Sequence, residues 1–336
     1  MRISLRYALL LSALSLTVAG NASTAQVASS QSNSAPPPLW AFFAPDAEQP
    51  PAKPPQSEPQ SLPGSTRQYT TAQINDLKNP PDWFPNEHSS MPTVVARGGE
   101  GKVFACASCH LTSGMGHPQS SPLAGKPIAY SIRQIAEFKT GARRNPIVVD
   151  GKPVMNAPEF MTAIAKDMTD EQAKEAAIWF AQLKTRPWIK VVETGTVPAT
   201  YITRSFSRAM RPSGGTEPLG SRIIELPQDA ARVAARDPRV GFVAYVPVGS
   251  IGRGRVLVTN GGGKTLPCST CHGADLKGMA DVPGIAGVSP TYVFRQLYGF
   301  RDGSRNGAMA VLMKDVVKNL SDDEMIDIAA YMASLQ

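Results

Sequence analysis

The pentapeptides Cys106-Ala107-Ser108-Cys109-His110 and Cys268-Ser269-Thr270-Cys271-His272 decide how this chain is organised. Cys-x-x-Cys-His is the attachment signature of a c-type haem. Positions three apart share a helix face, so both thiols reach the two vinyl groups of one porphyrin, and the adjacent His turns its imidazole onto the iron. The sequence therefore predicts two covalently attached haems c. The predicted cofactor-binding residues are Cys106, Cys109 and His110 in the first motif and Cys268, Cys271 and His272 in the second.

The two motifs use all four cysteines of the chain, which leaves no thiol for a disulfide. Two other interpretations of a Cys-x-x-Cys pair are a thioredoxin-like redox pair and half of a zinc site. A zinc site needs its ligand pairs close together, whereas these pairs stand 162 residues apart and each has its own flanking pattern. Both motifs therefore favour haem attachment.

The residues that follow the two motifs repeat as well, which indicates an internal duplication. From an Ala-Gly pair to a Gly-x-Arg sequence, the offsets in the two copies are identical. The shared residues are Tyr130, Arg133, Gln134, Phe138, Gly141 and Arg143 in the first copy and Tyr292, Arg295, Gln296, Phe300, Gly303 and Arg305 in the second. One haem-binding unit is therefore expected twice.

Each copy ends in a segment with strong helix signals. Thr169-Asp170-Glu171-Gln172 and Ser321-Asp322-Asp323-Glu324 are capping boxes with acids in the first turn. Beyond them, apolar residues recur at helical spacing. Shorter helices are predicted ahead of the two motifs, over residues 91–97 and 251–258.

The N-terminus predicts export. Residues 1–25 combine a basic start, an apolar run and small residues, which is the pattern of a cleaved signal peptide. The apolar run is short for a membrane span, and no later segment is long and apolar enough to cross a bilayer. Because bacteria attach c-type haems outside the cytoplasm, we expect a periplasmic protein without a transmembrane anchor after cleavage.

Residues 26–66 are rich in Ser, Gln and Pro, and this composition favours a disordered, extended tether. The run Leu39-Trp40-Ala41-Phe42-Phe43 is an apolar exception within the tether. We interpret it as a transient cluster in a disordered segment.

Residues 187–249 separate the two copies and are long for a linker. They carry three β-prone runs, at residues 188–192, 223–226 and 242–246. Residues 204–220 are predicted to form a loop. We expect a partly extended connector that packs on both copies.

The formal net charge of +7 does not indicate a nucleic-acid partner. Loss of Arg2 and Arg6 with the signal peptide lowers it to +5. Two haems add about four propionate charges, which brings the holoprotein nearer to neutral. The chain also has no Lys/Arg-rich tract of the kind that binds a phosphate backbone.

Both copies resemble class I cytochrome c domains, and in tandem they resemble the two-domain dihaem c-type cytochromes of bacterial electron-transfer chains. The resemblance covers residues 91–184 and 250–336. It implies an all-α fold, with cytochrome c domains at residues 67–186 and 250–336. It also implies that a proline carbonyl, of Pro122 or Pro283, accepts a hydrogen bond from Nδ1 of the haem-binding His.

The same resemblance implies a methionine as the sixth ligand of each iron, just upstream of the closing helix. Met161 and Met313 each stand eight residues before a helix cap, and this shared register favours them. Met168 occupies the place of Leu320, which indicates a core role. The predicted metal ligands are His110, Met161, His272 and Met313. The alternatives are Met155 and Met168 in the first copy and Met309 in the second.

Two further histidines leave bis-His coordination as an alternative. His117 stands seven residues after His110, too near to reach the other haem face without a sharp reversal. His88 lies in a loop and is expected to be solvated. The first copy also has Leu111 where the family pattern has Gly, and about ten extra residues before Met161. The two haem pockets are therefore expected to differ.

An electron carrier is the leading prediction. His and Met together fill both axial positions, so the iron cannot readily bind a substrate, and Met raises the potential. No catalytic residue is predicted, and the chain is not expected to be an enzyme. One alternative is the cytochrome subunit of a larger dehydrogenase. Another is a dihaem peroxidase, which needs an open distal position and an acid–base group. The expected partners are a redox donor and acceptor, such as a dehydrogenase, another cytochrome or an oxidase.

Overall fold

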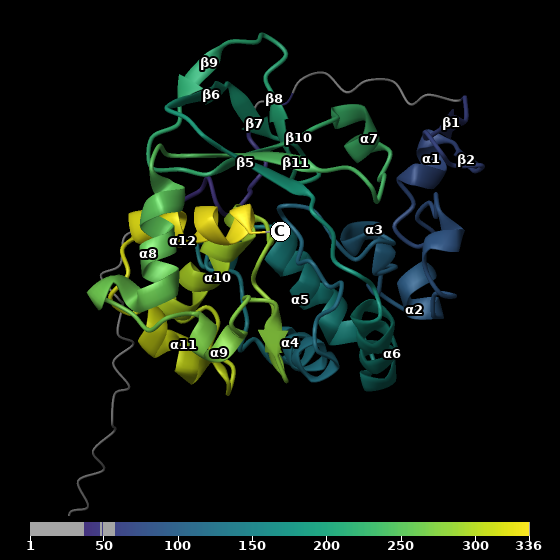
Figure 1. Cartoon of the computed structure of the whole chain (residues 1–336). Helices are drawn as coiled ribbons and strands as arrows, with labels where there is room; N and C mark the ends of the chain where they lie inside the picture. Colours follow the sequence, from purple (N-terminus) through teal and green to yellow (C-terminus); the bar gives the residue numbers. More distant parts are fainter. Residues whose placement is uncertain (1–36, 48, 50–57, 336) are drawn as a thin grey trace, which may run out of the picture. The chain divides into compact units, whose positions relative to one another are not determined.

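The computed structural model describes residues 37–47, 49 and 58–335 of the chain (Figure 1). The predicted signal peptide, residues 1–25, lies outside the described residues, as do parts of the Pro-rich segment that follows it. No helix within the described ranges is long and apolar enough to span a membrane.

The two copies fold into the same order of helices. In the first copy these are α2 (Thr93–Ala96), α3 (Ala107–His110), α4 (Ile128–Thr140), α5 (Ala157–Asp167) and α6 (Asp170–Ala181). In the second copy they are α8 (Ser250–Asn260), α9 (Ser269–His272), α10 (Pro290–Asp302), α11 (Ala310–Val317) and α12 (Asp322–Ser334). Both attachment motifs form the short helices α3 and α9, as the spacing of their cysteines requires.

The local helix signals account for where these helices begin and end. Thr169 and Ser321 form complete capping boxes at the starts of α6 and α12, which confirms both predictions. Gly141 and Gly303 end α4 and α10 with a left-handed backbone, φ +77° and +80°. The predicted helices ahead of the motifs are also present, as the short α2 and the longer α8.

Helices α8 and α12 of the second copy cross at close range. Gly254 of α8 lies at the crossing, where an added Cβ would stand 1.9 Å from the carbonyl oxygen of Asp327. Arg253 next to it pairs with the Asp327 carboxylate, with Nε 2.7 Å from Oδ2. The small residue and the ion pair together fix how the first and last helices of this copy pack.

The predicted all-α fold is confirmed only in part. The two repeats are mainly helical, although each carries one two-stranded hairpin, and the connector, which was predicted to be partly extended, forms a small β-region. Strands β5 (Ile189–Glu193), β10 (Ile224–Pro227) and β11 (Phe242–Val246) form one sheet, and they run side by side in Figure 1. Strand β11 is central: it pairs antiparallel with β10 and parallel with β5. All three strands fall on the β-prone runs of the sequence.

Two hairpin-like pairs extend the connector. Strand β6 (Thr196–Pro198) pairs with β9 (Thr216–Pro218), and β7 (Thr200–Ile202) pairs with β8 (Arg208–Met210). The predicted loop at residues 204–220 is therefore wrong in part, because two strands form within it. The short helix α7 (Ala230–Ala234) lies between β10 and β11 of the connector.

Small elements complete the fold outside the repeats' main helices. Those of the N-terminal part are β1 (Gln60–Ser61), β2 (Gln68–Tyr69), α1 (Thr71–Ile74) and the 3-10 helix η1 (Pro85–Glu87). Those within the repeats are the hairpins β3 (Val148–Val149) with β4 (Lys152–Pro153) and β12 (Gly278–Met279) with β13 (Val282–Pro283), and the 3-10 helix η2 (Gly261–Gly263). The hairpin of β3 and β4 is formed by the extra residues of the first copy.

The aromatic run at residues 39–43 is packed, so its prediction as a transient cluster in a disordered tether is wrong. Phe42 and Phe43 are each 3% exposed. Trp40 stands 4.6 Å from Phe294 between ring centroids, and Phe42 stands 5.5 Å from Tyr298. Large aromatic side chains bury enough apolar area to hold an otherwise proline-rich segment against α10.

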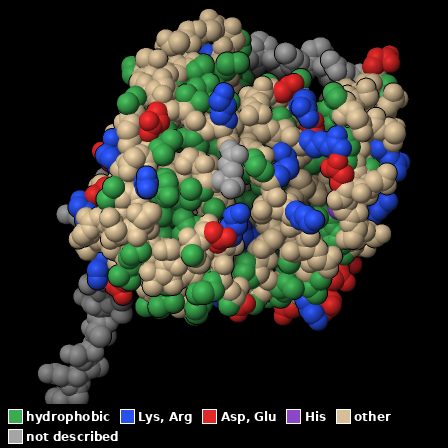
Figure 2. All heavy atoms as spheres, viewed as in Figure 1, with side chains coloured by type: hydrophobic (Ala, Val, Ile, Leu, Met, Phe, Trp, Pro, Cys, Tyr) green, Lys and Arg blue, Asp and Glu red, His purple; other side chains and the backbone are tan. Residues whose placement is uncertain are grey.

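Charged side chains are mixed on the surface. Figure 2 shows Lys and Arg side chains interspersed with Asp and Glu over the face in view, with apolar patches between them. The positive net charge is therefore not gathered into one continuous patch on that face.

Candidate functional site

The first attachment motif has its histidine fixed by a backbone hydrogen bond. Its His110 is 7% exposed, and Nδ1 of the ring stands 2.8 Å from the carbonyl oxygen of Ser121. A carbonyl only accepts hydrogen bonds, so Nδ1 carries the proton and Nε2 keeps its lone pair for a metal. Cys106, at the N-cap of α3, and Cys109 within this helix form no disulfide.

The second motif repeats this geometry. Nδ1 of His272 donates to the carbonyl oxygen of Pro283 over 2.8 Å, which confirms the prediction for Pro283. In the first copy the acceptor is Ser121, and the prediction of Pro122 is wrong by one residue. Both acceptors stand eleven residues after their His, so the position in the loop matters and the residue type does not.

Burial tunes the groups of both motifs toward neutral forms. Desolvation lowers the pKa of His110 and of His272, although their backbone hydrogen bonds act in the opposite direction. Before haem attachment converts the thiols to thioethers, desolvation also raises the pKa of Cys106 to about 12 and that of Cys268 to about 11. Neutral imidazoles are the form that binds a metal.

A cavity of about 660 Å³ lies against the first motif. This volume falls within the range of sites for cofactor-sized ligands. Cys106, Cys109 and His110 line it, and so do Met161 and Met168. The helix with the attachment motif and the segment with the predicted sixth ligand thus meet at one cavity, with largely apolar side chains around them.

The alternative methionines of the first copy differ in their surroundings. Met155 is 54% exposed and is not among the residues that line the cavity. Met168 is 4% exposed and packs with the apolar core of the first copy. Met161 is half-buried and packs against the edge of that core.

In the second copy, Met313 of α11 packs half-buried against the apolar core. Met309 is 51% exposed. Leu320, which occupies the place of Met168, is 3% exposed and belongs to the core. The duplicated register therefore gives Met168 and Leu320 the same core position.

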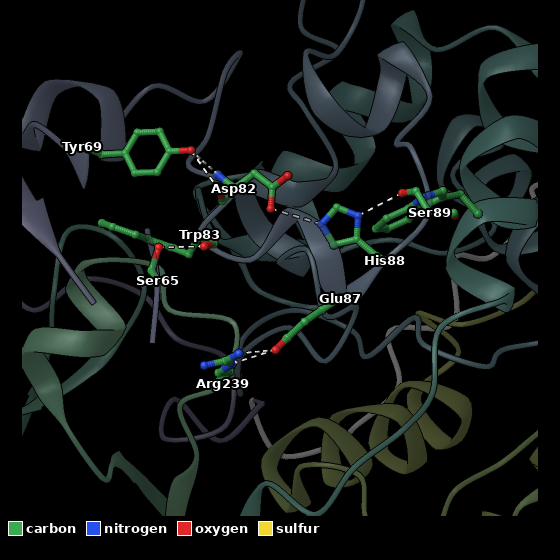
Figure 3. A network of polar contacts seen from close by, with 9 residues as sticks. Ser65, Tyr69, Asp82, Trp83, Glu87, His88, Ser89 and Arg239 are labelled. Carbon is green, nitrogen blue, oxygen red and sulfur yellow. Dashed lines mark hydrogen bonds and ion pairs between the residues drawn. The ribbon is translucent and has the colours of Figure 1, made fainter. Parts of the chain in front are cut away.

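The two spare histidines have other contacts. Figure 3 shows His88 between Asp82 and Ser89: its Nε2 is 3.1 Å from Oδ1 of Asp82, and its Nδ1 is 2.9 Å from the carbonyl oxygen of Ser89. His117 is 8% exposed at the cavity wall, with Nδ1 3.3 Å from the carbonyl oxygen of Cys109. Desolvation lowers the pKa of His117 to about 4. The predicted solvated state of His88 is wrong, because both ring nitrogens have protein partners.

Leu111 follows the first motif with φ +61° and ψ +163°. Gly273 has nearly the same backbone after the second motif, φ +84° and ψ +156°. Glycine adopts these backbone torsion angles freely, whereas residues with a side chain are strained by them. The sequence difference at this place is thus a point of backbone strain directly after His110.

The sequence did not reveal a cluster of arginines and glutamines where the two copies meet. Arg143 donates to Gln134 of its own copy (2.9 Å) and to Gln296 of the other (2.8 Å). Arg305 likewise donates to Gln296 (3.2 Å) and to Gln134 (2.7 Å). We call these four residues the seam cluster. The Gln and the Arg stand at equivalent positions of the two copies, and this duplicated spacing is the only hint of the cluster that the sequence gives.

The backbone at the seam follows the same local symmetry. The amide of Arg144 donates to Ser304 (2.9 Å), and the amide of Asn306 donates to Ala142 (2.6 Å). The two donors stand at equivalent positions of the duplicated unit, and so do the two acceptors. The copies therefore meet through the same segment, in opposite orientation.

The seam cluster fits a haem carboxylate. Arg143 and Arg305 are 8% and 7% exposed and line the first cavity. Both guanidinium groups donate to side-chain amide oxygens of the glutamines. In addition, Nε of Arg305 is buried without a hydrogen-bond partner. A buried guanidinium is stable when it is paired with an anion, and a haem propionate is an anion of the required shape.

The sequence matches the cytochrome c family twice, over residues 96–184 and 253–336, which together are just over half of the chain. This protein belongs to the cytochrome c family. Each match contains one attachment motif, one half-buried methionine and one closing helix, so two cytochrome c domains stand in tandem.

Three relatives show where the likeness extends. The cytochrome c-554(548) of Halomonas halodenitrificans is 43% identical over 68 residues, which are 20% of this chain and 82% of that protein. The thiosulfate dehydrogenase electron acceptor of Stutzerimonas stutzeri is 26% identical over 246 residues, 72% of this chain and 84% of that protein. The cytochrome c4 of Azotobacter vinelandii is 23% identical over 244 residues, 71% and 89%.

The two motifs and the two family matches define a dihaem c-type cytochrome that carries electrons. The cofactors are two covalently attached haems c, one for each domain. The resemblance noted in the sequence is thereby confirmed over both repeats.

Proposed function

We propose that the protein is an exported carrier of single electrons in which His110 and Met161 bind the first iron and His272 and Met313 bind the second. The observation that carries this proposal is the cavity with both His110 and Met161 in its wall. When bound, a haem supplies one-electron chemistry at iron. The chain would attach it through two cysteines, orient one imidazole through a backbone carbonyl, and supply a methionine thioether as the second protein ligand of the iron.

The seam cluster has a place in this proposal. Arg143 and Arg305 bring two positive charges into a nearly dry interface between the domains. The propionates of the two haems are the carboxylates that these charges would bind, because charge-assisted hydrogen bonds to guanidinium are strong at buried sites. The glutamines then orient the guanidiniums toward both domains.

Filled axial positions make this chain a carrier and not an enzyme by itself. An iron with both positions occupied does not bind peroxide or another substrate, and the thioether favours the reduced state. We propose cytochrome c domains at residues 67–186 and 250–336, joined by the connector at 187–249. A signal peptide at residues 1–25 directs this protein to the periplasm.

A dehydrogenase is the electron donor that we propose. One relative that matches 72% of this chain is named for accepting electrons from thiosulfate dehydrogenase. A carrier of similar domain content would receive electrons from a periplasmic dehydrogenase, either as a separate protein or as its cytochrome subunit. Another cytochrome or an oxidase would then accept them.

The ligand assignment is tested by Met161→Ala in the oxidised holoprotein. A methionine bound to ferric haem c gives a weak near-infrared band of sulfur-to-iron charge transfer, and two such ligands contribute equally. We expect Met161→Ala to remove about half of this band and to open one iron to imidazole. The absorbance per haem in the near infrared measures the loss.

The matched control is Met168→Leu, because the second domain has a leucine, Leu320, at the equivalent position. It should keep the whole band, because Met168 is a core residue in the proposal. Loss of about half of the band in Met168→Leu, with a full band in Met161→Ala, would contradict the assignment and make Met168 the ligand.

A further inference from the structure

The two attachment motifs are copies of one unit but lie in unequal surroundings. Ala107 and Ser108, between the cysteines of the first motif, are 3% and 0% exposed. At the same places of the second motif, Ser269 is half-buried and Thr270 is exposed. Because the repeats share their helices and their His–carbonyl bonds, the difference comes from segments outside the repeated unit.

Helix α7 of the connector and the residues just after it contact the first motif and its cavity. Arg236, just after this helix, donates from its guanidinium to the carbonyl oxygen of Ser108. It also donates to the carbonyl oxygen of Ile74 over 2.7 Å, so one side chain joins the N-terminal part to the motif. Val233 and Ala234 of α7 line the same cavity as His110.

The turn between β7 and β8 closes the methionine side of this cavity. Residues 203–209 all line it, and Phe206 stands at the tip of the turn. The ring of Phe206 packs against Phe160, with centroids 5.6 Å apart and planes at 62°. Phe160 directly precedes Met161 on α5, so the tip contacts the segment that presents the sixth ligand.

Phe206 adopts φ +59°, which is unusual for an aromatic residue. Such a backbone persists where the surrounding contacts hold it. Here Ser207 accepts from the side-chain amide of Gln119 in the first domain (3.1 Å), and Arg208 donates to Thr200 (2.8 Å) and to the carbonyl oxygen of Trp40 (3.1 Å). The turn is therefore anchored, and its aromatic tip is fixed over the cavity.

We propose that the connector turn encloses the first haem site and that Phe206 is a positioning residue for the Met161 side of that site, whereas the second site stays open to solvent. This inference rests on the proposed ligation by Met161 and Met313. It makes the first haem the interior one and leaves the second motif as the place where electrons enter and leave the protein.

Access of imidazole to an opened iron tests the enclosure. Met161→Ala opens the first site and Met313→Ala opens the second, and stopped-flow absorbance gives the rate at which imidazole binds to each ferric holoprotein. We expect the second site to bind at least about tenfold faster, because a gate over the first site must move before the ligand enters. Adding Phe206→Gly to Met161→Ala should raise the first rate about tenfold and should leave the rate of Met313→Ala unchanged.

Phe206→Gly removes the ring without straining the turn, since glycine adopts positive φ at no steric cost. Met210→Ala is the control, because Met210 lies in β8 but is 59% exposed and does not line the cavity. It should leave both rates as they are. Equal rates at the two sites, or a first-site rate that Phe206→Gly leaves unchanged, would overturn the enclosure. Failure of Met161→Ala to create any imidazole site would instead overturn the ligand proposal.

Discussion

His88 joins two segments that are far apart in the sequence. It bonds Asp82 and the carbonyl of Ser89 within the N-terminal loop (Figure 3). The same carbonyl accepts a hydrogen bond of 3.2 Å from the indole of Trp179 in α6, and the rings of His88 and Trp179 stand 5.5 Å apart. One histidine thus ties the loop ahead of α2 to α6, the closing helix of the first domain.

This tie predicts a pH-dependent stability. The hydrogen bond to Asp82 raises the pKa of His88 above its usual value, although burial opposes it. A raised folded-state pKa gives stabilisation that is complete below the unfolded pKa of about 6.5 and is lost as the pH rises through the folded value. We expect the free energy of unfolding of the wild type to exceed that of His88→Gln by more at pH 5.5 than at pH 9.

Urea unfolding at a series of pH values measures this difference. Asp82→Asn is the matched variant, because it keeps the shape of the partner and removes the charge that holds the proton. It should reduce the same pH-dependent difference. A difference between wild type and His88→Gln that stays constant with pH would contradict the role of the Asp82 pair.

For single residues, the sequence is informative where a function needs certain residue types at a fixed spacing. The six cysteine and histidine positions of the two motifs follow from such spacing. Ser121 was missed because its role belongs to a backbone carbonyl, and the position of a carbonyl depends on the loop and not on the side chain. The partners of His88 were missed for a related reason, since a loop histidine shows no contact in the sequence.

Helices α6 and α12 begin with the same reciprocal cap. The amide of Gln172 donates to Oγ1 of Thr169 (3.2 Å), and the amide of Thr169 donates back to the Gln172 side chain (3.0 Å). Ser321 and Glu324 make the corresponding pair at 3.3 Å and 2.9 Å. Each cap satisfies two backbone amides that a helix start would otherwise leave without partners.

Replacing either cap should cost a similar amount of stability. Thr169→Ala and Ser321→Ala each remove one side-chain acceptor, and we expect each to lower the free energy of unfolding by about 1 kcal/mol. Denaturant unfolding followed by far-ultraviolet circular dichroism measures the loss. Thr169→Ser and Ser321→Thr keep the hydroxyl and should stay close to the wild type. Wild-type stability in both alanine variants would show that the caps do not hold these helices.

The elements that were predicted correctly have local signals. The closing helices follow from four-residue caps and helical spacing, and strands β5, β10 and β11 follow from β-branched and aromatic runs. Strands β8 and β9 were missed because their polar residues form strands only by pairing with β7 and β6. The aromatic run at residues 39–43 was missed because its order comes from α10, which lies some 250 residues later in the chain.

The two repeats have the same order of helices, but the segments outside them contact the two attachment motifs unequally. The repeats meet through the seam cluster, where each arginine donates to a glutamine of both domains. The connector and the N-terminal part then contact the first attachment motif, whose Ser108 is 0% exposed, whereas Thr270 at the same place of the second motif is exposed. The duplication was plain in the sequence, but this asymmetry was not, because it depends on where the connector folds back.

Unequal coverings predict unequal haems. Shielding from solvent and contacts with charged groups both shift the potential of a haem iron. The first site has the connector turn and the strained Leu111 beside it, whereas the second site has Gly273 in the place of Leu111. The two irons should therefore take up electrons at different potentials, although their ligands are of the same kind.

A spectroelectrochemical titration of the purified holoprotein tests the central claim, that this chain carries single electrons on two haems, most directly. Small mediators equilibrate with both haems, and the α-band absorbance reports how many electrons each chain has accepted. The predicted result is two electrons per chain, taken up reversibly in two separate one-electron steps. Uptake of a single electron per chain would contradict the account, because it would leave one attachment motif without a working haem.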